Sequence, residues 1–582
     1  MTMQKALELH QSNSLSEAEQ AYRALLAAEP GNSQVRFLLG TCLLQLSRFD
    51  ESISVLEPLT EHPSAGPDIF NNLGIAYRAS GNLEGAISAF QQAIKANPDY
   101  SQAYFNLGEL LETGNALKEA AQCYRKTLEL TPTDRQAGAA FARVLTRMKN
   151  WADAENIYRQ LLSGDSENEE YQVQLAFVLA SSRRLEEALE IYQELLSRKP
   201  DFPEILSSVC YLHERLGNFP EARRYALKAL EQKPDHAEGW NNLGSVALAE
   251  HQPAEALQHF QKAIELSPGL ILAHFNIATT QLLLEEYESG WTGYEYRLSL
   301  MPTRFPRYAE SNWRGEPVPG KSLLIIADQG CGDTLQFVRF LKTAQNVSAA
   351  NVTLLCQEEL VTLLAPTFKD VCTVVSTIEN STPFDLQIPL CSLPQVLQVH
   401  QSDQIGDGGY IQIPETASVE VTTLARELDQ GMKKIGIAWQ GNPSQDRDQL
   451  RSCPLDKLRP LFELPGIQWV NLQVNEQSRT DLESLQTSAR FLHAGPLVND
   501  FRDTVWLMDQ LDLVLTVDTA VAHLAGAVGH PVWTMLCHTP DWRWLLSGEK
   551  SPWYSHMRLF RQPAWNDWMS VITEVKAELA AL

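Results

Sequence analysis

The stretch DLVLTVDTAVAHLAGAVGHP, residues 512–531, decides the fold of the second half of the chain. Leu513–Val517 is a short run of leucine and β-branched residues, which is typical of a buried strand. Ala520–Val528 is rich in alanine and lacks proline, so it predicts a helix. A strand that turns directly into a helix leaves unpaired backbone N–H groups in front of the positive end of the helix dipole. The stretch therefore predicts an α/β fold with an anion-binding turn, and phosphate is the usual occupant of such a turn.

Three side chains at this turn carry the first functional hypothesis. If Asp518 is the N-cap, Thr519 and His523 are four residues apart and share the face of the first helical turn. A hydroxyl and an imidazole on that face could both contact a diphosphate. The alternative is that Asp518 only caps the helix and His523 packs against a neighbour. The segment alone leaves both interpretations open.

Bulk properties exclude several classes of function. The chain has 582 residues and a net charge of -25, with a pI near 5.0, which disfavours nucleic acid or an anionic membrane as the main partner. The first twenty residues lack the apolar core of a signal peptide, and no apolar run is long enough for an integral membrane segment. Nine scattered cysteines without a C-x-x-C pair indicate reduced thiols. These features predict a cytoplasmic protein.

The first half of the chain repeats itself every 34 residues. One small residue recurs without a gap, at Gly40, Gly74, Gly108, Ala142, Ala176, Cys210, Gly244 and Ala278. In register with it run an alanine series from Ala86 to Ala256 and a proline series from Pro98 to Pro268, in which Ser166 fills one place. Aromatic residues precede the prolines at Phe90, Tyr124, Tyr158, Tyr192 and Phe260.

This is the tetratricopeptide pattern of paired helices. Small residues let two helices approach, the aromatic residue is expected to fill the gap between neighbouring pairs, and proline ends the second helix. Units of this kind stack into a superhelix because one unit cannot bury its apolar face alone. We expect about eight units over residues 1–300. A peptide or protein in the groove of the array is the favoured partner, and a scaffold or a homo-oligomer contact is the alternative.

After a linker at residues 301–321, strands alternate with helices, which predicts mainly parallel sheets. The alternation stops in a polar stretch at residues 401–409 and then resumes. We therefore expect two Rossmann-like lobes, residues 322–431 and 432–582, with a ligand site beyond the carboxyl ends of their strands.

The loop after the first strand of this half contains Gly330 and Gly332, which allow close approach of a ligand, and Asp333, which could act as a general base. The alternative is a tight turn with an aspartate cap. Leu335 stands where a dinucleotide fingerprint needs its third glycine, and the chain has no phosphate-binding loop of the ATPase type. A nicotinamide enzyme and an ATPase are therefore both disfavoured.

A second loop has a turn at Gly441 and Asn442, followed by Arg451 and Ser452, which could hold a phosphate. Within it, the sequence at residues 446–448 has the D-x-D spacing of a metal site but is better explained as a solvated charge cluster, so no metal is expected. Five tryptophans near the C-terminus are expected mainly to pack in the core. They are Trp542, Trp544, Trp553, Trp565 and Trp568.

Residues 290–575 resemble the bacterial tetratricopeptide–glycosyltransferase proteins. Their catalytic part is similar to that of the lipopolysaccharide heptosyltransferases and, more distantly, to that of the O-linked N-acetylglucosamine transferases. The matching motifs are GWTGYEYR (290–297), WRGEP (313–317), DQGCGDTLQF (328–337), WQGNP (439–443), RSCPL (451–455), DTAVAHLAGA (518–527) and PDWRWL (540–545).

The resemblance implies two lobes of the GT-B type and metal-independent, inverting transfer of a sugar from a nucleotide-sugar. It places Asp333 as the catalytic aspartate and Arg451 near a phosphate-binding lysine of the relatives. The donor-binding turn of the relatives corresponds to Asp518, Thr519 and His523. A uridine diphosphate sugar is the expected donor by analogy only.

Two positions depart from the family pattern. Gln445 stands about where relatives often carry a histidine, which weakens the case for a histidine base in that loop. Asp328 and Cys331 replace the usual glutamate and leucine, which is a milder change. The competing hypothesis is a non-catalytic tetratricopeptide scaffold with a degenerate nucleotide-sugar domain.

Overall fold

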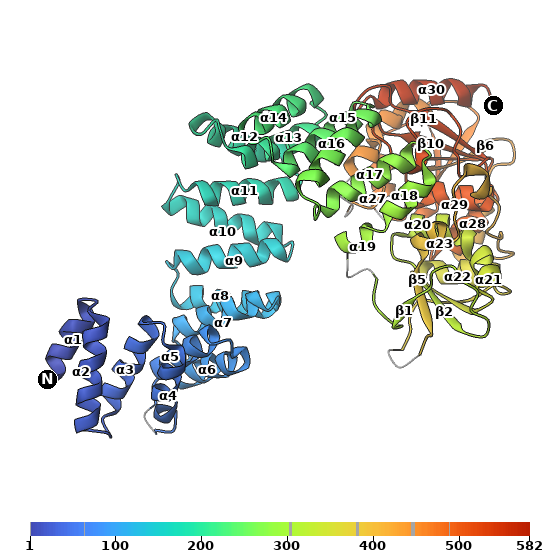
Figure 1. Cartoon of the computed structure of the whole chain (residues 1–582). Coiled ribbons are helices and arrows are strands. Elements are labelled where there is room, and N and C mark those ends of the chain that lie inside the picture. The colour runs from blue at the N-terminus through green and yellow to red at the C-terminus, as the bar shows by residue number, and fades with distance from the viewer. Residues whose placement is uncertain are drawn as a thin grey trace. The chain divides into compact units, whose positions relative to one another are not determined.

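A computed structural model describes residues 2–62, 65–301, 305–379, 383–443, 448–475, 477–487 and 489–582. It divides into two compact units, Met1–Leu212 and His213–Leu582 (Figure 1). The boundary differs from the expected one near residue 300, because the last repeats pack into the same unit as the α/β part. Each unit is described by itself.

Within its described residues, the first unit contains helices and no strand, and its helices follow the 34-residue register. From the sixth helix on, each second helix of a pair ends two residues before the conserved proline or serine position of the register. The helices are α1 (Met3–Gln11), α2 (Leu15–Ala28), α3 (Ser33–Gln45), α4 (Phe49–Thr60), α5 (Pro67–Ala79), α6 (Leu83–Ala96), α7 (Ser101–Thr113), α8 (Leu117–Leu130), α9 (Arg135–Arg147), α10 (Trp151–Gly164), α11 (Glu169–Ser181), α12 (Leu185–Arg198) and α13 (Pro203–Arg215), which crosses the boundary.

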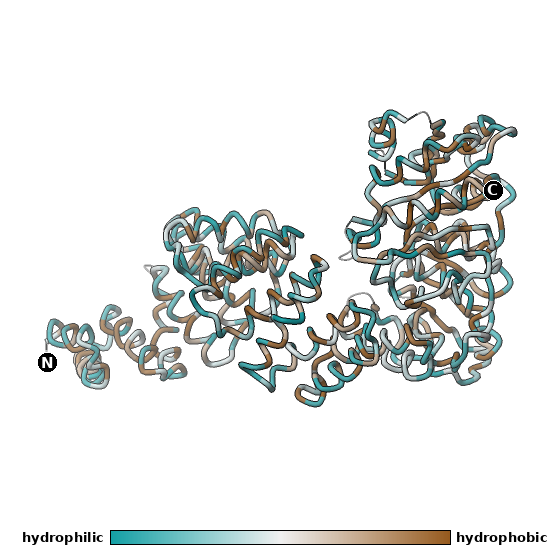
Figure 2. The backbone as a smooth tube through the Cα atoms, turned by 90° about the horizontal axis from the view of Figure 1, so that it is seen from above, coloured by the Kyte–Doolittle hydropathy of each residue, from teal (hydrophilic) through white to brown (hydrophobic). Residues whose placement is uncertain are grey.

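The repeated small and aromatic residues meet inside one helix pair. A Cβ atom on Gly74 of α5 would lie 2.5 Å from the ring of Phe90 in α6, and one on Gly108 would lie 2.8 Å from Tyr124. The aromatic residue thus fills a gap within its own pair, because the missing side chain of the glycine makes the room that the ring occupies. Phe90 also belongs to one buried cluster with Leu107 and Leu110 of the next pair, as expected for a residue between neighbouring pairs. Hydrophobic and hydrophilic residues alternate along these helices, as Figure 2 shows.

The second unit begins with the end of the repeat array. Its helices here are α14 (Phe219–Gln232), α15 (Ala237–Ala249), α16 (Pro253–Leu266), α17 (Ile271–Leu283), α18 (Tyr287–Tyr294) and α19 (Arg297–Leu300).

The last helices of the array are anchored in the α/β part. Trp291 of α18 is buried and makes edge-on ring contacts with Phe337, Trp542 and Trp553. Arg297 is also buried, and its Nε donates to Asp328 Oδ2 at 2.9 Å. Asp328 thus serves this anchor. The ring contacts and the ion pair explain why the repeats and the α/β part share one unit.

The first lobe is built on a five-stranded sheet with the order β1-β5-β2-β3-β4, in which all pairs are parallel. Its elements are β1 (Ser311–Asn312), β2 (Ser322–Ile326), α20 (Cys331–Phe337), η2 (Val338–Phe340), α21 (Leu341–Ser348), β3 (Asn351–Leu355), α22 (Glu358–Thr367), β4 (Thr373–Val375), β5 (Leu386–Pro389), η3 (Leu390–Ser392), α23 (Leu393–Val396), η4 (Ser402–Gln404) and α24 (Val419–Ala425).

Part of the stretch expected to be a linker belongs to this lobe. β1 adds to the edge of the sheet beside β5, and the Trp313 N–H donates to the Gln387 carbonyl at 2.8 Å. The Trp313 side chain is buried at the same place. Burial of a tryptophan and one strand pairing therefore tie this segment to the sheet, which the high proline and glycine content did not indicate.

The second lobe has a six-stranded parallel sheet with the order β11-β10-β9-β6-β7-β8. The expected strand and helix at residues 512–531 are confirmed as β9 (Leu513–Val517) and α29 (Ala520–Val528). The elements are β6 (Lys433–Ala438), α25 (Asp448–Arg451), η5 (Leu455–Leu458), α26 (Arg459–Phe462), β7 (Ile467–Asn471), α27 (Gln477–Ser484), β8 (Arg490–His493), η6 (Gly495–Leu497), α28 (Phe501–Met508), β9 (Leu513–Val517), α29 (Ala520–Val528), β10 (Val532–Leu536), η7 (Trp542–Trp544), β11 (Met557–Arg561) and α30 (Trp568–Ala580).

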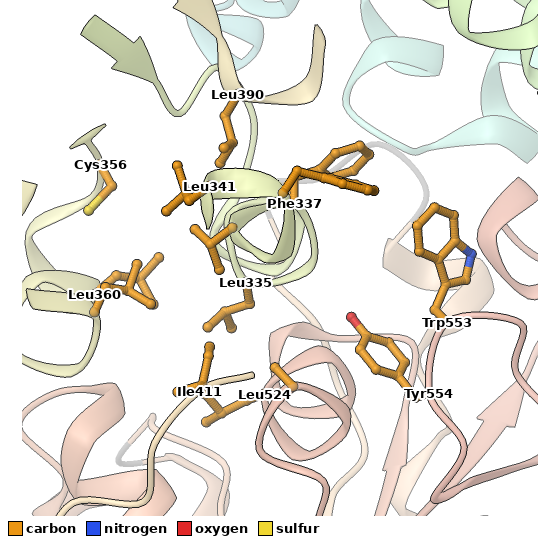
Figure 3. Packing of buried hydrophobic residues seen from close by; sticks show 14 of the residues in the cluster. Leu335, Phe337, Leu341, Cys356, Leu360, Leu390, Ile411, Leu524, Trp553 and Tyr554 are labelled. Carbon is orange, nitrogen blue, oxygen red and sulfur yellow. The ribbon is translucent and has the colours of Figure 1, made fainter. Parts of the chain in front are cut away.

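A single hydrophobic core joins the two lobes. Leu335 of α20 and Leu524 of α29 belong to one buried cluster, and Ile411 lies beside them (Figure 3). Trp553 of the second lobe lies on the Phe337 side of the same cluster, and Tyr554 lies on the Leu524 side. Since α20 and α29 both begin at loops predicted to be functional, this packing brings the two loops together.

Candidate functional site

The order of the second sheet reverses between β6 and β9, which are neighbours in the sheet although β7 and β8 lie between them in the chain. In open parallel sheets, ligands bind beyond the carboxyl ends of the strands at such a point. Gly441 follows β6 by three residues, and Asp518 follows β9 directly. Two of the three predicted loops therefore lie at the same edge of the sheet.

The turn between β9 and α29 differs in one respect from the prediction. Thr519, not Asp518, is the N-cap residue, and its side chain caps no backbone group. Instead the Thr519 hydroxyl lies 3.1 Å from that of Thr516. Within the described part of the chain, the backbone N–H groups of Ala520 and Val521 donate to no backbone acceptor. The amide groups that would bind an anion are therefore still available at this helix start.

Because Thr519 is the N-cap residue, the carboxyl group of Asp518 does not cap α29. Burial raises the pKa of Asp518 to about 6, and the neighbouring Asp541 carboxylate adds to the rise, while Arg451 opposes it. A carboxyl group of this kind changes its charge close to neutral pH. The charge on this turn is therefore not fixed, and an arriving anion can change it.

His523 is held tightly by its neighbours. Its Nδ1 lies 3.0 Å from the Tyr554 hydroxyl, and its ring stacks on Trp544 with centroids 5.1 Å apart. Burial, together with the positive charge of Arg543, lowers the pKa of His523 to about 3. The imidazole is therefore neutral at physiological pH. This matches the packed alternative for the residue, and donor contact remains a prediction.

The glycine loop of the first lobe meets this turn directly. α20 and α29 lie side by side (Figure 1). A Cβ atom on Gly332 would lie 2.9 Å from His523 Cδ2 and 3.6 Å from Ala520 Cα. Gly332 therefore allows the two helix starts to approach, whereas we expected it to make room for a ligand. The Gly330 N–H donates to Asp333 Oδ2 at 3.0 Å.

Asp333 is both a cap and a member of the site. Its Oδ2 accepts the Gly330 N–H, and its Oδ1 accepts a hydrogen bond from the Arg543 guanidinium. Burial raises the pKa of Asp333, and the Arg543 charge works against that rise. The cap predicted as the alternative is thus present, and the role of Asp333 as a base remains a prediction.

Arg543 is the functional candidate that sequence reasoning missed. It lies between two tryptophans in η7 and is only 6% exposed. Its Nε donates to Gln336 Oε1 at 2.6 Å and its Nη1 donates to Asp541 Oδ1 at 2.7 Å. An arginine inside an aromatic segment was the available signal, because a buried cation needs a buried counter-charge.

The second loop forms a compact turn. Arg451 Nε donates to Asp448 Oδ1 at 3.3 Å, and the Gly441 N–H donates to Ser452 Oγ at 3.1 Å. A side chain on Gly441 would collide with the side-chain ends of both Asp448 and Arg451, so it would displace the ion pair that closes this turn. Arg451 is one of the charges that act on Asp518, which places it at the predicted site.

Only part of this second loop belongs to the described residues. Asn442 lies in the described turn. Gln445 and the first two residues of the D-x-D sequence, Asp446 and Arg447, lie outside the described residues. Asp448 pairs with Arg451. Across the described ranges, no group of three or more histidine, cysteine, aspartate or glutamate side chains is arranged to hold a metal ion.

The C-terminal tryptophans are largely buried, as expected. Trp542, Trp544, Trp553 and Trp568 are each at most 6% exposed. Trp565 is half-buried and contacts the Phe219 ring edge-on.

Comparison with known protein families supports the prediction that the helical array consists of tetratricopeptide repeats. One model, described as a tetratricopeptide repeat, matches residues 71–135 and 211–271. A second model with the same description matches residues 9–66 and 145–209. With the 34-residue register and the paired helices, these matches show that the helical part is a tetratricopeptide repeat array.

Individual proteins resemble the chain over part of its length. Protein FlbA of Caulobacter vibrioides is 24% identical over 398 residues, which are 58% of this chain and 66% of FlbA. The chain therefore spans just under two thirds of that relative. Among solved structures, YrrB, described as a tetratricopeptide protein with an unusual peptide-binding site, is 26% identical and covers 32% of this chain and 97% of its own, with a TM-score of 0.27. A tetratricopeptide protein from Parabacteroides merdae is 17% identical and covers 48% of this chain and 97% of its own, with a TM-score of 0.31.

Within the described ranges, no helix combines the length and the apolar character needed to cross a membrane.

Proposed function

We propose that the second unit is a glycosyltransferase of the GT-B type, which moves a sugar from a nucleotide-sugar to an acceptor hydroxyl without a metal ion and with inversion. One observation carries the proposal. Asp333 lies on α20 of the first lobe, which packs against α29 of the second lobe, and Arg543 donates a hydrogen bond to Asp333. Base, cation and anion-binding amides are the three elements that such a transfer needs.

In the proposed reaction, the diphosphate of the donor lies on the free N–H groups of Ala520 and Val521. Arg451 and Arg543 stabilise the negative charge that grows on the diphosphate as its bond to the sugar breaks. Asp333 accepts the proton of the acceptor hydroxyl, whose oxygen forms the new bond to the sugar carbon. The electron pair of the broken bond leaves with the diphosphate.

The position of Thr519 and His523 narrows their proposed roles. The Thr519 hydroxyl is already paired with Thr516, and the neutral His523 ring is fixed by Tyr554 and Trp544. Both residues therefore shape the start of α29 and do not supply charge. A uridine diphosphate sugar is the proposed donor, by analogy with the family that the motifs resemble.

A peptide or protein is the proposed partner of the repeat array. YrrB is described as having a peptide-binding site, and repeat arrays present extended surfaces. The array would then select the acceptor, which could be a side chain of the bound protein.

A second function is favoured by one specific observation. Both carboxylate oxygens of Asp333 are engaged, one by Gly330 and the other by Arg543. A carboxylate that only caps α20 and holds the lobes together would suit a non-catalytic scaffold with a degenerate nucleotide-sugar domain.

A donor-binding measurement separates the two functions. The full-length protein is melted with a panel of nucleoside diphosphates and their sugars, and a ligand at a hundred times its Kd stabilises the folded protein by about 2.7 kcal/mol. We expect one nucleotide to raise the melting temperature of the parent and of Asp512→Asn to the same extent. It should raise that of Asp518→Asn by more, because the carboxyl group of Asp518 places negative charge beside the proposed diphosphate site. Asp512 is the matched control because it precedes β9 at the opposite end of the strand.

The catalytic step needs its own test. With the donor and an extract that supplies acceptors, Asp333→Asn should bind the donor but transfer no sugar. Sugar transfer by Asp333→Asn at the parental rate would refute the assignment of the base. Absence of any nucleotide-dependent shift in the folded parent would refute the transferase proposal and favour the scaffold.

A further inference from the structure

Arg543 links the lobes through a small set of hydrogen bonds. Two of its acceptors, Asp333 and Gln336, are on α20 of the first lobe. The third, Asp541, belongs to the segment of Arg543 itself in the second lobe. The guanidinium is therefore shared between the proposed base and a carboxylate of its own lobe.

The guanidinium is also held in a defined place. Its Cζ lies 4.2 Å from the centroid of the Trp542 ring, a distance typical of a cation–π contact. Asp541 caps the short η7 helix that carries Arg543 by accepting the Arg543 N–H at 3.1 Å. The η7 segment thus holds the charge of Arg543 at the site. The N–H groups of its guanidinium can still change their acceptors.

The same charge acts on the start of α29. Arg543 is among the groups that lower the pKa of both Asp518 and His523. Gly332, which stands next to Asp333, is in van der Waals range of α29. The donor diphosphate proposed to bind at α29 and the carboxylate of Asp333 would therefore be neighbours of one guanidinium.

A guanidinium forms its strongest hydrogen bonds with phosphate and carboxylate oxygens, in a fixed fork geometry. A doubly charged diphosphate is a stronger partner than one carboxylate. While Arg543 donates to Asp333, that carboxylate is neutralised and is a weak base. Once the Arg543 guanidinium is withdrawn from Asp333, the carboxylate is buried without a counter-charge and becomes a stronger base.

We propose that Arg543 is a switch operated by the donor: the diphosphate of the nucleotide-sugar takes over the guanidinium hydrogen bonds that Asp333 now receives, and Asp333 is released to accept the proton of the acceptor. The inference rests on the proposed transferase function. It adds to that function an order of events, in which the base becomes active only after the donor is bound.

This competition predicts that loss of a proposed catalytic residue increases the affinity for diphosphate. If Asp333 and the diphosphate compete for Arg543, Asp333→Asn should bind diphosphate more tightly than the parent, because the guanidinium is free. If Arg543 only holds the lobes together, Asp333→Asn should bind diphosphate equally well or less well.

The test uses isothermal titration calorimetry of the full-length protein with inorganic diphosphate as the probe, since every nucleoside diphosphate sugar contains this group. We expect affinity to rise about fivefold or more in Asp333→Asn and to fall about tenfold or more in Arg543→Met. In the double variant, affinity should equal that of Arg543→Met, because the competition needs both groups. Arg543→Lys, which keeps the charge but not the fork, should weaken binding by less and replaces Arg543→Met if that variant does not fold.

The outcomes separate this inference from the function on which it rests. If the parent binds diphosphate but Asp333→Asn binds it no more tightly, the switch is refuted and the transferase proposal stands. The switch is also refuted if Asp333→Asn tightens binding to the same extent without Arg543, since simple removal of a negative charge would then explain the gain. If the folded parent binds neither diphosphate nor any nucleotide of the panel, the switch and the transferase proposal both fail.

Discussion

The contact between the two lobes at Gly332 can be tested by adding one methyl group. In Gly332→Ala, the new Cβ atom would lie 2.9 Å from His523 Cδ2. The imidazole cannot move aside, because Tyr554 and Trp544 fix it from two directions. Overpacking of a rigid contact of this kind typically costs 1–3 kcal/mol. We expect the second unit to lose about that much stability.

Gly330→Ala is a matched control in the same loop. A Cβ atom at that position would meet only Asp333 Oδ2, at 3.5 Å, which is an ordinary contact. The backbone angle φ of Gly330 is -75°, which alanine adopts without strain. This variant should therefore be about as stable as the parent, although it alters the same glycine-rich sequence.

Urea denaturation followed by tryptophan fluorescence measures the difference. The chain has thirteen tryptophans, and all but Trp151 lie in the second unit, so the signal reports that unit. With a slope of about 3 kcal/mol per molar urea, the midpoint of Gly332→Ala should fall by roughly 0.3–1 M. Equal midpoints for Gly332→Ala and Gly330→Ala would refute the close packing of α20 against α29.

Three further predictions concern the anchor, the array and the donor turn. Asp328→Ala leaves the buried Arg297 without its closest counter-charge in the first lobe, so the second unit should lose about 3 kcal/mol in the same urea assay; a loss below 1 kcal/mol would contradict the role of this ion pair. Gly244→Val drives a side chain into the Phe260 ring, which a Cβ atom would approach to 2.6 Å, and should cost about 1–3 kcal/mol of stability; an unchanged melting curve by circular dichroism at 222 nm would refute that packing. Because folding raises the pKa of Asp518 from about 4 to about 6, the folded protein binds the extra proton and loses stability as the pH rises through this window. Asp518→Asn should therefore be more stable than the parent by about 3 kcal/mol at pH 7 but not at pH 4. The same difference in unfolding free energy in urea curves at both pH values would contradict the raised pKa.

Local patterns were sufficient to predict much of the fold. The 34-residue spacing of glycine, alanine and proline defined the helix pairs, because each pair must bury the same face against the next. The β9–α29 boundary was predicted within one residue, and the N-cap moved from Asp518 to Thr519. Both side chains can cap a helix, so their order in the chain could not decide between them.

The candidate site was harder to predict, because its members are far apart in the chain. Asp333 and Arg543 are 210 residues apart, and no short-range pattern connects them. Arg543 was overlooked because the tryptophans on both sides of it indicated that this segment packs in the hydrophobic core. The division into compact units at residue 212 was not predicted for a related reason, since Trp291 of the last repeat helices packs against the α/β part.

The sequence by itself determined the repeat array, the alternation of strands and helices, and the loops at strand ends. These features depend on the periodicity of hydrophobic residues and on the local preferences of glycine and proline. Only the tertiary structure decided which charges face one another: Arg297 with Asp328, Arg451 with Asp448, and Arg543 with Asp333. Electrostatic partners are chosen by distance in the folded chain, and burial then sets how strongly each pair shifts the chemistry of its members.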